Sequence, residues 1–119
     1  RDSALQMKGI KDYVLEGDTL YFAGKYWDAL QKYESARRFG YRNLDEKIRR
    51  TDDIRMNTLE IYRRKALVFE EAHDPRDKSD KDGAKQIACD FYCLALSLSP
   101  KAPDLQEKVR VLGCRCGEK

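Results

Sequence analysis

The sequence predicts an all-α protein, and three features of its 119 residues support that prediction. Apolar residues recur at spacings of about three and four along most of the chain, as they do on one face of an α-helix. The 3 prolines and most of the 7 glycines fall between these periodic stretches, where they mark turns. A content of 41% hydrophobic and 38% charged residues is that of a globular domain with a highly charged surface.

Two helices are expected at the start of the chain. The first covers residues 3–23, and Gly24 ends it because glycine readily adopts the positive φ of a tight helix–helix turn. The second covers residues 26–39 and ends at Gly40.

A third, much longer helix is expected over residues 43–73, which contain neither glycine nor proline. Asn43 with Glu46 three residues later has the form of a capping box at its start. Pro75 closes the stretch, because proline disfavours a helical conformation in the residue before it. Residues 74–83 are nearly all charged or turn-forming and predict an exposed loop. 

Two shorter helices complete the chain. One is expected over residues 84–99, and the other over residues 104–112, with Asp104 as its N-cap and Gly113 at its end.

A pattern of large and small residues occurs twice. The first copy consists of Tyr13, Gly17, Leu20, Ala29, Tyr33 and Ala36, and the second of Tyr62, Ala66, Phe69, Ala88, Tyr92, Ala95 and Pro100. Small residues allow paired helices to approach closely, and large residues fill the gaps beside them. The second copy spans 19 positions from Phe69 to Ala88, against 9 from Leu20 to Ala29 in the first, and the charged loop accounts for the surplus.

This pattern resembles the tetratricopeptide repeat family over about residues 10–100, and residues 43–49 resemble residues 104–110 at an offset of 61. The resemblance implies one domain, 1–119, of antiparallel helical hairpins stacked as a short right-handed α-solenoid. Repeat 1 would cover about residues 10–43, repeat 2 about 59–103, and a C-terminal capping helix about 104–112. The chain departs from the family at Glu16 and Lys65, where an apolar residue is usual. An ordinary helical bundle is the alternative.

The resemblance also implies a scaffold that binds a peptide or a partner domain in a concave groove. Carried over by position, the groove residues are Lys11, Val14, Asp18, Tyr21, Glu60, Arg63, Leu67 and Glu70. For the charged members a merely solvated helix face is the alternative. Arg63 favours an acidic partner. Val14 and Asp18 stand where chaperone-binding members of the family carry Lys and Asn, which argues against chaperone docking.

Charge and hydropathy narrow the partner class. A net charge of +3, from 24 basic and 21 acidic residues, offers no strongly basic face for nucleic acid. No apolar run is long enough to predict a membrane span. The chain begins without Met or an apolar signal core, so we expect a piece of a longer protein, with the cytoplasm slightly favoured. Only Leu5 and Met7 precede the first hairpin, which predicts an exposed apolar strip used by neighbouring repeats or by self-association.

The cysteines offer a second hypothesis. Cys89 and Cys93 lie one helical turn apart, and Cys114 and Cys116 form a C-x-C pair. Four thiolates could hold zinc and staple a helical structural domain. The spacing matches no common zinc module, so packing or incidental thiols are the preferred interpretation. A disulfide between Cys114 and Cys116 would require a strained loop.

The sequence does not predict an enzyme. It contains no nucleophile motif, phosphate-binding loop or paired carboxylates, so no catalytic residue, cofactor or metal is expected. His73, the only histidine, is interpreted as a cap at the end of the long helix.

Overall fold

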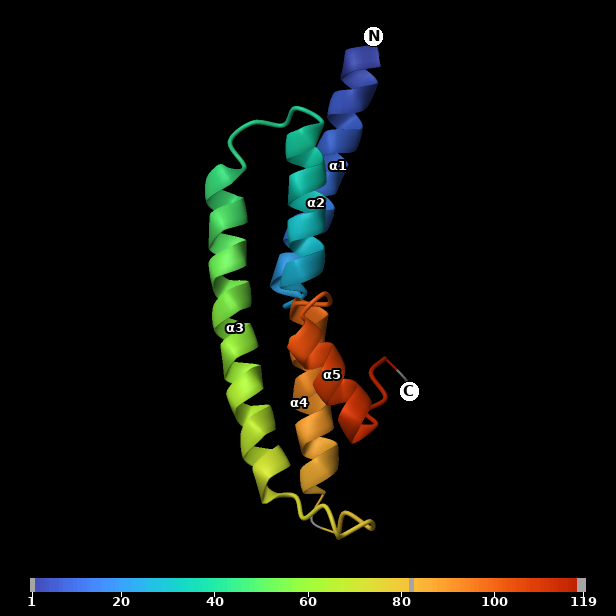
Figure 1. Cartoon of the computed structure of the whole chain (residues 1–119). Helices are drawn as coiled ribbons and strands as arrows, with labels where there is room; N and C mark the ends of the chain where they lie inside the picture. Colours follow the sequence, from blue (N-terminus) through green and yellow to red (C-terminus); the bar gives the residue numbers. More distant parts are fainter. Residues whose placement is uncertain (1, 82, 118–119) are drawn as a thin grey trace. The chain divides into compact units, whose positions relative to one another are not determined.

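The computed structural model describes the backbone of residues 2–81 and 83–117. Within those ranges it also describes the solvent exposure of Gly9 and the side chains from residue 11 onward. This part of the chain contains five helices and no strand: α1 (Asp2–Phe22), α2 (Tyr26–Arg38), α3 (Asp45–Ala72), α4 (Ala84–Leu98) and α5 (Pro103–Leu112) (Figure 1). The all-α prediction is confirmed, and every helix end lies within two residues of its expected position. The side chains of Leu5 and Met7, expected to border an apolar strip, lie outside the described residues.

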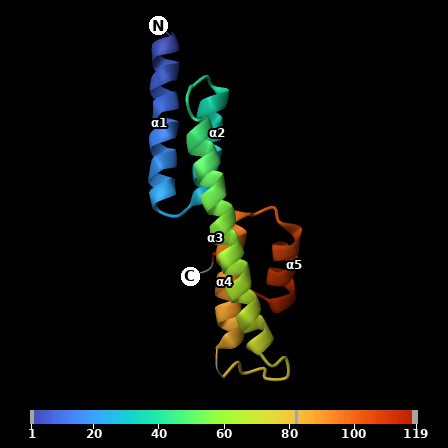
Figure 2. The ribbon, with the colours of Figure 1, turned by 90° about the vertical axis from the view of Figure 1, so that its left-hand side faces the viewer.

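The chain divides into two compact units, Arg1–Met56 and Asn57–Lys119. Unit 1 contains α1, α2 and the first part of α3, and unit 2 contains the rest of α3 with α4 and α5. Within unit 1, α1 and α2 lie side by side and run in opposite directions (Figures 1 and 2). Within unit 2, α4 runs antiparallel to the second part of α3, and α5 packs on α4.

The turn between α1 and α2 is built on Gly24, as the sequence predicts. Its φ is 79°, in the left-handed region that glycine adopts without a steric penalty. The Gly24 amide donates to the Tyr21 carbonyl at 3.0 Å, and the Lys25 amide donates to the Leu20 carbonyl at 2.9 Å. These bonds satisfy carbonyls at the end of α1 and reverse the chain into α2.

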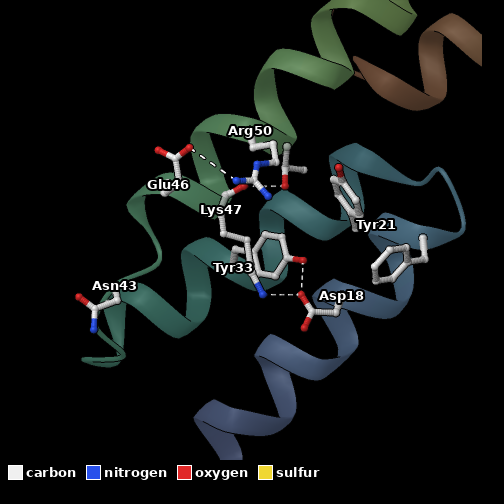
Figure 3. Close-up of a pocket in the computed structure, with 9 residues that line it drawn as sticks. Asp18, Tyr21, Tyr33, Asn43, Glu46, Lys47 and Arg50 are labelled. Carbon is white, nitrogen blue, oxygen red and sulfur yellow. Dashed lines mark hydrogen bonds and ion pairs between the residues drawn. The ribbon is translucent and has the colours of Figure 1, made fainter.

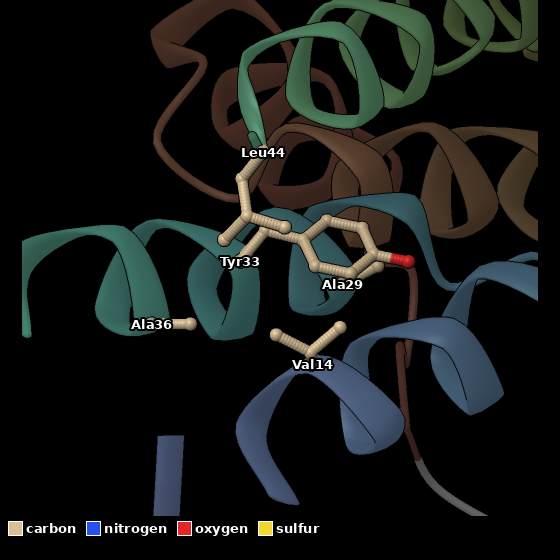
Figure 4. Close-up of a cluster of buried hydrophobic side chains, with 5 residues drawn as sticks. All are labelled: Val14, Ala29, Tyr33, Ala36 and Leu44. Carbon is tan, nitrogen blue, oxygen red and sulfur yellow. The ribbon is translucent and has the colours of Figure 1, made fainter. Parts of the chain in front are cut away.

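The core of unit 1 consists of Val14, Ala29, Tyr33, Ala36 and Leu44 (Figure 4). Gly17 lies against this cluster, because a Cβ atom there would be only 2.6 Å from Cε1 of Tyr33. The Tyr33 ring therefore occupies the space that the missing side chain of Gly17 leaves. The expected role of these small residues, close approach of paired helices, is confirmed in this hairpin.

Unit 2 has a corresponding core around Ala66 and Tyr92. Its buried members include Leu59, Ala66, Ala88, Tyr92, Ala95, Leu98 and Leu105. The ring of Phe91 lies 6.1 Å from that of Tyr62 and 6.2 Å from that of Phe69, centroid to centroid. Lys65, one of the departures from the repeat pattern, places its ammonium 5.6 Å from the centre of the Phe91 ring. The other departure, Glu16, forms an ion pair with Lys32 at 2.7 Å.

The expected capping box at the start of α3 is wrong. The helix begins at Asp45, and the Ile48 amide donates to the Leu44 carbonyl at 2.8 Å, which makes Leu44 the N-cap. Asn43 precedes the cap with a φ of 67°, a left-handed conformation that asparagine tolerates better than most residues. Burial of the Leu44 side chain in the core of unit 1 accounts for this shift in register.

The N-cap of α5 also differs from expectation. Ala102 is the cap and Pro103 occupies the first helical position, which suits a residue without an amide hydrogen. Asp104 lies in the first turn, where its carboxylate binds the guanidinium of Arg63.

Two aspartates form hydrogen bonds within the described part of the loop between α3 and α4. The Asp80 carboxylate accepts hydrogen bonds from the amides of Lys85 at 3.0 Å and Gln86 at 3.1 Å. It therefore caps the first turn of α4, although it lies several residues before that helix. Asp77 accepts a hydrogen bond from the Ser79 amide at 3.1 Å and another from the Ser79 hydroxyl at 2.6 Å.

Candidate functional site

Unit 1 contains two cavities on the side of α1 where the sequence predicts a groove. The first, of about 430 Å³, is lined by Asp18, Tyr21, Phe22, Tyr33, Asn43, Glu46, Lys47, Arg50 and Thr51 (Figure 3). The second, of about 600 Å³, is lined by Lys11, Val14, Gly40, Tyr41, Arg42, Asn43, Leu44 and Lys47. Asn43 and Lys47 border both cavities. Of the predicted residues, Asp18 and Tyr21 therefore line the first cavity, and Lys11 and Val14 line the second.

The helical period explains this arrangement. Residues 11, 14, 18 and 21 lie on one stripe of α1, because positions three and four apart face the same way. The opposite wall is the first part of α3, which presents Glu46, Lys47 and Arg50 (Figure 3). Val14 is buried in the core, so it supports the floor and offers little surface to a partner.

A hydrogen-bonded triad joins the three helices of unit 1. The Tyr33 hydroxyl on α2 donates to Oδ1 of Asp18 on α1 at 2.5 Å. The Lys47 ammonium on α3 donates to the same oxygen at 2.9 Å, and it lies 5.6 Å from the centre of the Tyr33 ring. We call Asp18, Tyr33 and Lys47 the first triad. It fixes the position of Asp18, which the sequence analysis assigned to partner binding.

The environment of the first triad shifts the pKa values of two members. Burial acts to raise the pKa of Asp18, but the hydrogen bonds from Tyr33 and Lys47 outweigh it and hold the pKa below the usual value of 3.8. Burial raises the pKa of Tyr33, and the hydrogen bond to the Asp18 carboxylate raises it further. At neutral pH Asp18 is therefore a carboxylate, and Tyr33 keeps the proton that it donates.

The exposed side chains that could contact a partner lie at the edge of the first cavity. Phe22 is 85% exposed, and its ring meets that of Tyr21 edge to face at 5.4 Å. Tyr21 in turn contacts Tyr26, with ring centroids 5.5 Å apart. On the facing helix, the Arg50 side chain is 68% exposed and lies 3.8 Å from the Glu46 carboxylate. An aromatic surface and a largely solvated guanidinium thus face the same cavity.

Several residues of this lining were missed by sequence analysis. Phe22, Arg50 and Asn43 were not assigned to the groove, and Tyr33 was assigned to packing alone. The resemblance between residues 43–49 and 104–110 was the one available signal, since it includes Lys47.

Unit 2 repeats the triad with different residues. Glu70 on α3 accepts a hydrogen bond from the Tyr92 hydroxyl on α4 and another from the Lys108 ammonium on α5, the latter at 2.8 Å. We call Glu70, Tyr92 and Lys108 the second triad. Burial acts to raise the pKa of Glu70, but the hydrogen bonds from Lys108 and Tyr92 lower it overall. Burial and the bond to Glu70 raise the pKa of Tyr92.

The other predicted groove residues of unit 2 have partners or solvent around them. Arg63 forms an ion pair with Asp104, so the guanidinium expected to attract an acidic partner already has an acidic group within the chain. Glu60 pairs with Arg64 at 3.2 Å. The Leu67 side chain is 46% exposed. Within unit 2, Leu67 is therefore the predicted groove residue most open to an apolar contact.

The expectation of packing or incidental thiols is wrong. Cys89 is joined to Cys114 and Cys93 to Cys116 by disulfides. The expected obstacle, a strained bridge between Cys114 and Cys116, does not arise because each of these residues pairs with α4 instead. In this form the four sulfurs are not thiolates that could hold zinc.

The described residues include no group of histidine, cysteine or acidic side chains placed to hold a metal ion. None of the helices in the described part of the chain combines the length and the hydrophobicity that crossing a membrane requires. Comparisons of the chain with known protein families, with curated proteins and with solved structures gave no match.

Proposed function

We propose that the chain is a non-enzymatic, tetratricopeptide-like scaffold that binds a peptide or a partner domain, with α5 as its C-terminal capping helix. In this proposal the two units are successive hairpins of a short right-handed α-solenoid. The observation that carries it is the repetition of the triad. In each unit a carboxylate on the first helix of a hairpin binds a tyrosine on the second helix and a lysine on the helix that follows. The tyrosines and the lysines occupy matching positions of the repeated pattern, whereas Asp18 and Glu70 lie one helical turn apart in it.

Further contacts recur at the positions that resemble each other in sequence. Leu44 and Leu105 are both buried. Glu46 binds Arg49 at 2.6 Å, and Glu107 binds Nε of Arg110 at 3.1 Å. Residues 43–49 and 104–110 therefore share their packing and their pairing, as two copies of one element would. This repetition supports a stacked architecture over an ordinary helical bundle.

The lining of the first cavity supports a particular kind of partner. Its net charge is balanced between Asp18, Glu46, Lys47 and Arg50, and the two acidic groups are engaged within the chain. Phe22 offers an apolar surface to the same cavity that the solvated Arg50 lines. An extended peptide carrying an aliphatic or aromatic side chain next to an acidic one fits this combination.

The two disulfides favour an oxidising compartment, rather than the expected cytoplasm, as the place where this binding occurs. Protein disulfides persist in secreted and extracytoplasmic settings and are rare where glutathione and thioredoxin keep thiols reduced.

A displayed library of random peptides, selected on the immobilised chain, tests the proposal. We expect enriched peptides with an apolar residue beside an acidic one. Phe22→Ser and Arg50→Glu should each weaken their binding at least about tenfold, because aromatic and arginine anchors dominate such contacts. Affinities measured by calorimetry on the purified variants give the comparison.

Two substitutions elsewhere on the same helices or hairpin serve as controls. Leu15→Ser removes an apolar side chain of α1 that is 63% exposed and lies outside both cavity linings. Arg38→Glu reverses an exposed charge of α2 outside the same linings. Both should bind like the unaltered chain. Equal loss in the controls, or selection of no peptide at all, would contradict the groove assignment.

A further inference from the structure

The two disulfides of unit 2 differ in how open they are to solvent. Cys89 is buried on α4, with 6% of its surface exposed, and its partner Cys114 is half-buried. One turn further along α4, Cys93 is half-buried and its partner Cys116 is exposed. An incoming reagent therefore reaches the Cys93–Cys116 bond first.

The Cys93–Cys116 bond also forms part of the wall of a cavity of about 640 Å³. The rest of that wall is largely hydrocarbon from Leu94, Leu96 and Pro100, and its two charged residues, Asp90 and Arg115, have opposite signs. The apolar side chains around the bond can contact apolar groups of the attacking molecule.

The surroundings of the other bond are less favourable to attack. The Cys89–Cys114 bond borders a smaller cavity of about 220 Å³, whose wall includes Asp80, Lys85, Gln86 and Arg115. The Asp80 carboxylate is fixed there by its hydrogen bonds to the first turn of α4. The smaller cavity and the burial of Cys89 therefore leave a peptide thiol less access to this bond.

We propose that the Cys93–Cys116 disulfide is a site of thiol–disulfide exchange for cysteine-containing peptides with apolar neighbours. The peptide thiolate attacks Sγ of Cys116 and forms a new S–S bond to it. The bond between Cys116 and Cys93 breaks, and its electron pair leaves with Sγ of Cys93 as a thiolate. A second thiolate attacks the peptide sulfur of the mixed disulfide and releases Cys116. Two thiols are thereby oxidised to one disulfide, and Cys93 and Cys116 are reduced by two electrons.

The neighbouring bond gives this exchange a structural consequence. Because Cys89 still holds Cys114, reduction of the Cys93–Cys116 bond releases residues 115–117 from α4 while the chain just before them remains attached. The reaction therefore changes one wall of the 640 Å³ cavity without dismantling the contact between α4 and α5. This inference is independent of the proposed groove in unit 1.

Exchange with two tripeptides, one with cysteine between leucines and one with cysteine between serines, tests the proposal on the intact chain. Samples are quenched by alkylation at successive times, and mass spectrometry of proteolytic peptides follows each disulfide separately. We expect the Cys93–Cys116 bond to open at least about tenfold faster than the Cys89–Cys114 bond. The leucine peptide should be the faster reagent at the first bond and should have no advantage at the second.

A substitution in the cavity wall tests whether the wall, and not only the solvent exposure of the disulfide, governs the exchange. Leu94→Ser should abolish the preference for the leucine peptide. Val111→Ser, which removes an exposed apolar side chain of α5 outside the cavity, is the matched control and should react like the unaltered chain. Equal opening rates of the two disulfides in the unaltered chain, or an unchanged peptide preference in Leu94→Ser, would overturn the proposal.

Discussion

The hydroxyl of Tyr33 donates a hydrogen bond to the carboxylate of Asp18 at 2.5 Å, across the interface between α1 and α2. Asp18 therefore stabilises the helical hairpin, and this role precedes any contact with a partner. The bond has a counterpart between Tyr92 and Glu70 in unit 2, so its contribution can be measured twice in one chain.

Removing either tyrosine hydroxyl should destabilise the protein. We expect Tyr33→Phe and Tyr92→Phe each to lower the free energy of unfolding by about 1–2 kcal/mol, because a hydrogen bond to a partly buried carboxylate is lost. Urea denaturation followed by circular dichroism measures the change. Tyr62→Phe is the control, since the contact described for Tyr62 is made by its ring against Phe91. A loss as large in Tyr62→Phe as in the other two would show that the hydroxyl bonds contribute little.

The triads also predict how stability depends on pH. The pKa values of Asp18 and Glu70 are lowered in the folded chain, so their contribution is complete above the ordinary values of 3.8 and 4.5 and is lost as the pH falls below them. The pKa values of Tyr33 and Tyr92 are raised, so their contribution is complete below the ordinary value of 10.0 and is lost at higher pH.

Urea midpoints measured across the pH range should therefore show a plateau with a decline on both sides. In Asp18→Asn the acidic decline should be shallower, because one of the carboxylates whose pKa is lowered in the folded chain is gone. An acidic limb as steep as that of the unaltered chain would mean that other groups cause the decline.

Gly17 and Gly9 offer opposite outcomes for the same substitution. Gly17→Ala should destabilise by about 1–3 kcal/mol, because the new methyl group would displace the Tyr33 ring. Gly9→Ala places its methyl group in open space on the same helix, so the higher helix propensity of alanine should leave stability unchanged or raise it by up to about 1 kcal/mol. Thermal unfolding of the pair gives the comparison. Matching melting temperatures would show that α1 and α2 can separate without loss.

Asp80 should contribute to unit 2 from within the loop. Asp80→Ala removes acceptors for the Lys85 and Gln86 amides and should cost about 1 kcal/mol, as the loss of a helix cap does. Lys78→Ala, at an exposed position of the same loop, should change stability little. Hydrogen exchange at Lys85 and Gln86 supplies a local readout. Unchanged protection of those amides in Asp80→Ala would exclude the capping role.

The helices and the hairpin cores were predictable because their signals are local. Apolar periodicity and Gly24 located the elements, and the small residues Gly17, Ala29, Ala66 and Ala88 identified the close contacts. Each of these signals depends on neighbours within a turn or two of helix, which the sequence displays directly.

The cysteine pairing and the roles of the acidic residues were not predictable in the same way. Cys89 meets Cys114 only because α5 turns the chain back along α4, and sequence spacing does not record that direction. Asp18 and Glu70 fall on the expected groove stripe, but whether they face a partner or a tyrosine depends on side-chain direction across a tertiary contact. Asp80 reaches its amides through the conformation of an irregular loop, for which no periodicity exists.

The position of Lys47 has a consequence for where this chain can be cut. Lys47 belongs by sequence to the helix that opens the second hairpin, yet its ammonium completes the contacts of the first. A fragment that ended at residue 43, after the first hairpin, would lack Lys47, so Asp18 and Tyr33 would lose the ammonium group that completes the first triad. A fragment that keeps the first triad intact must therefore extend beyond α2 into the opening turns of α3.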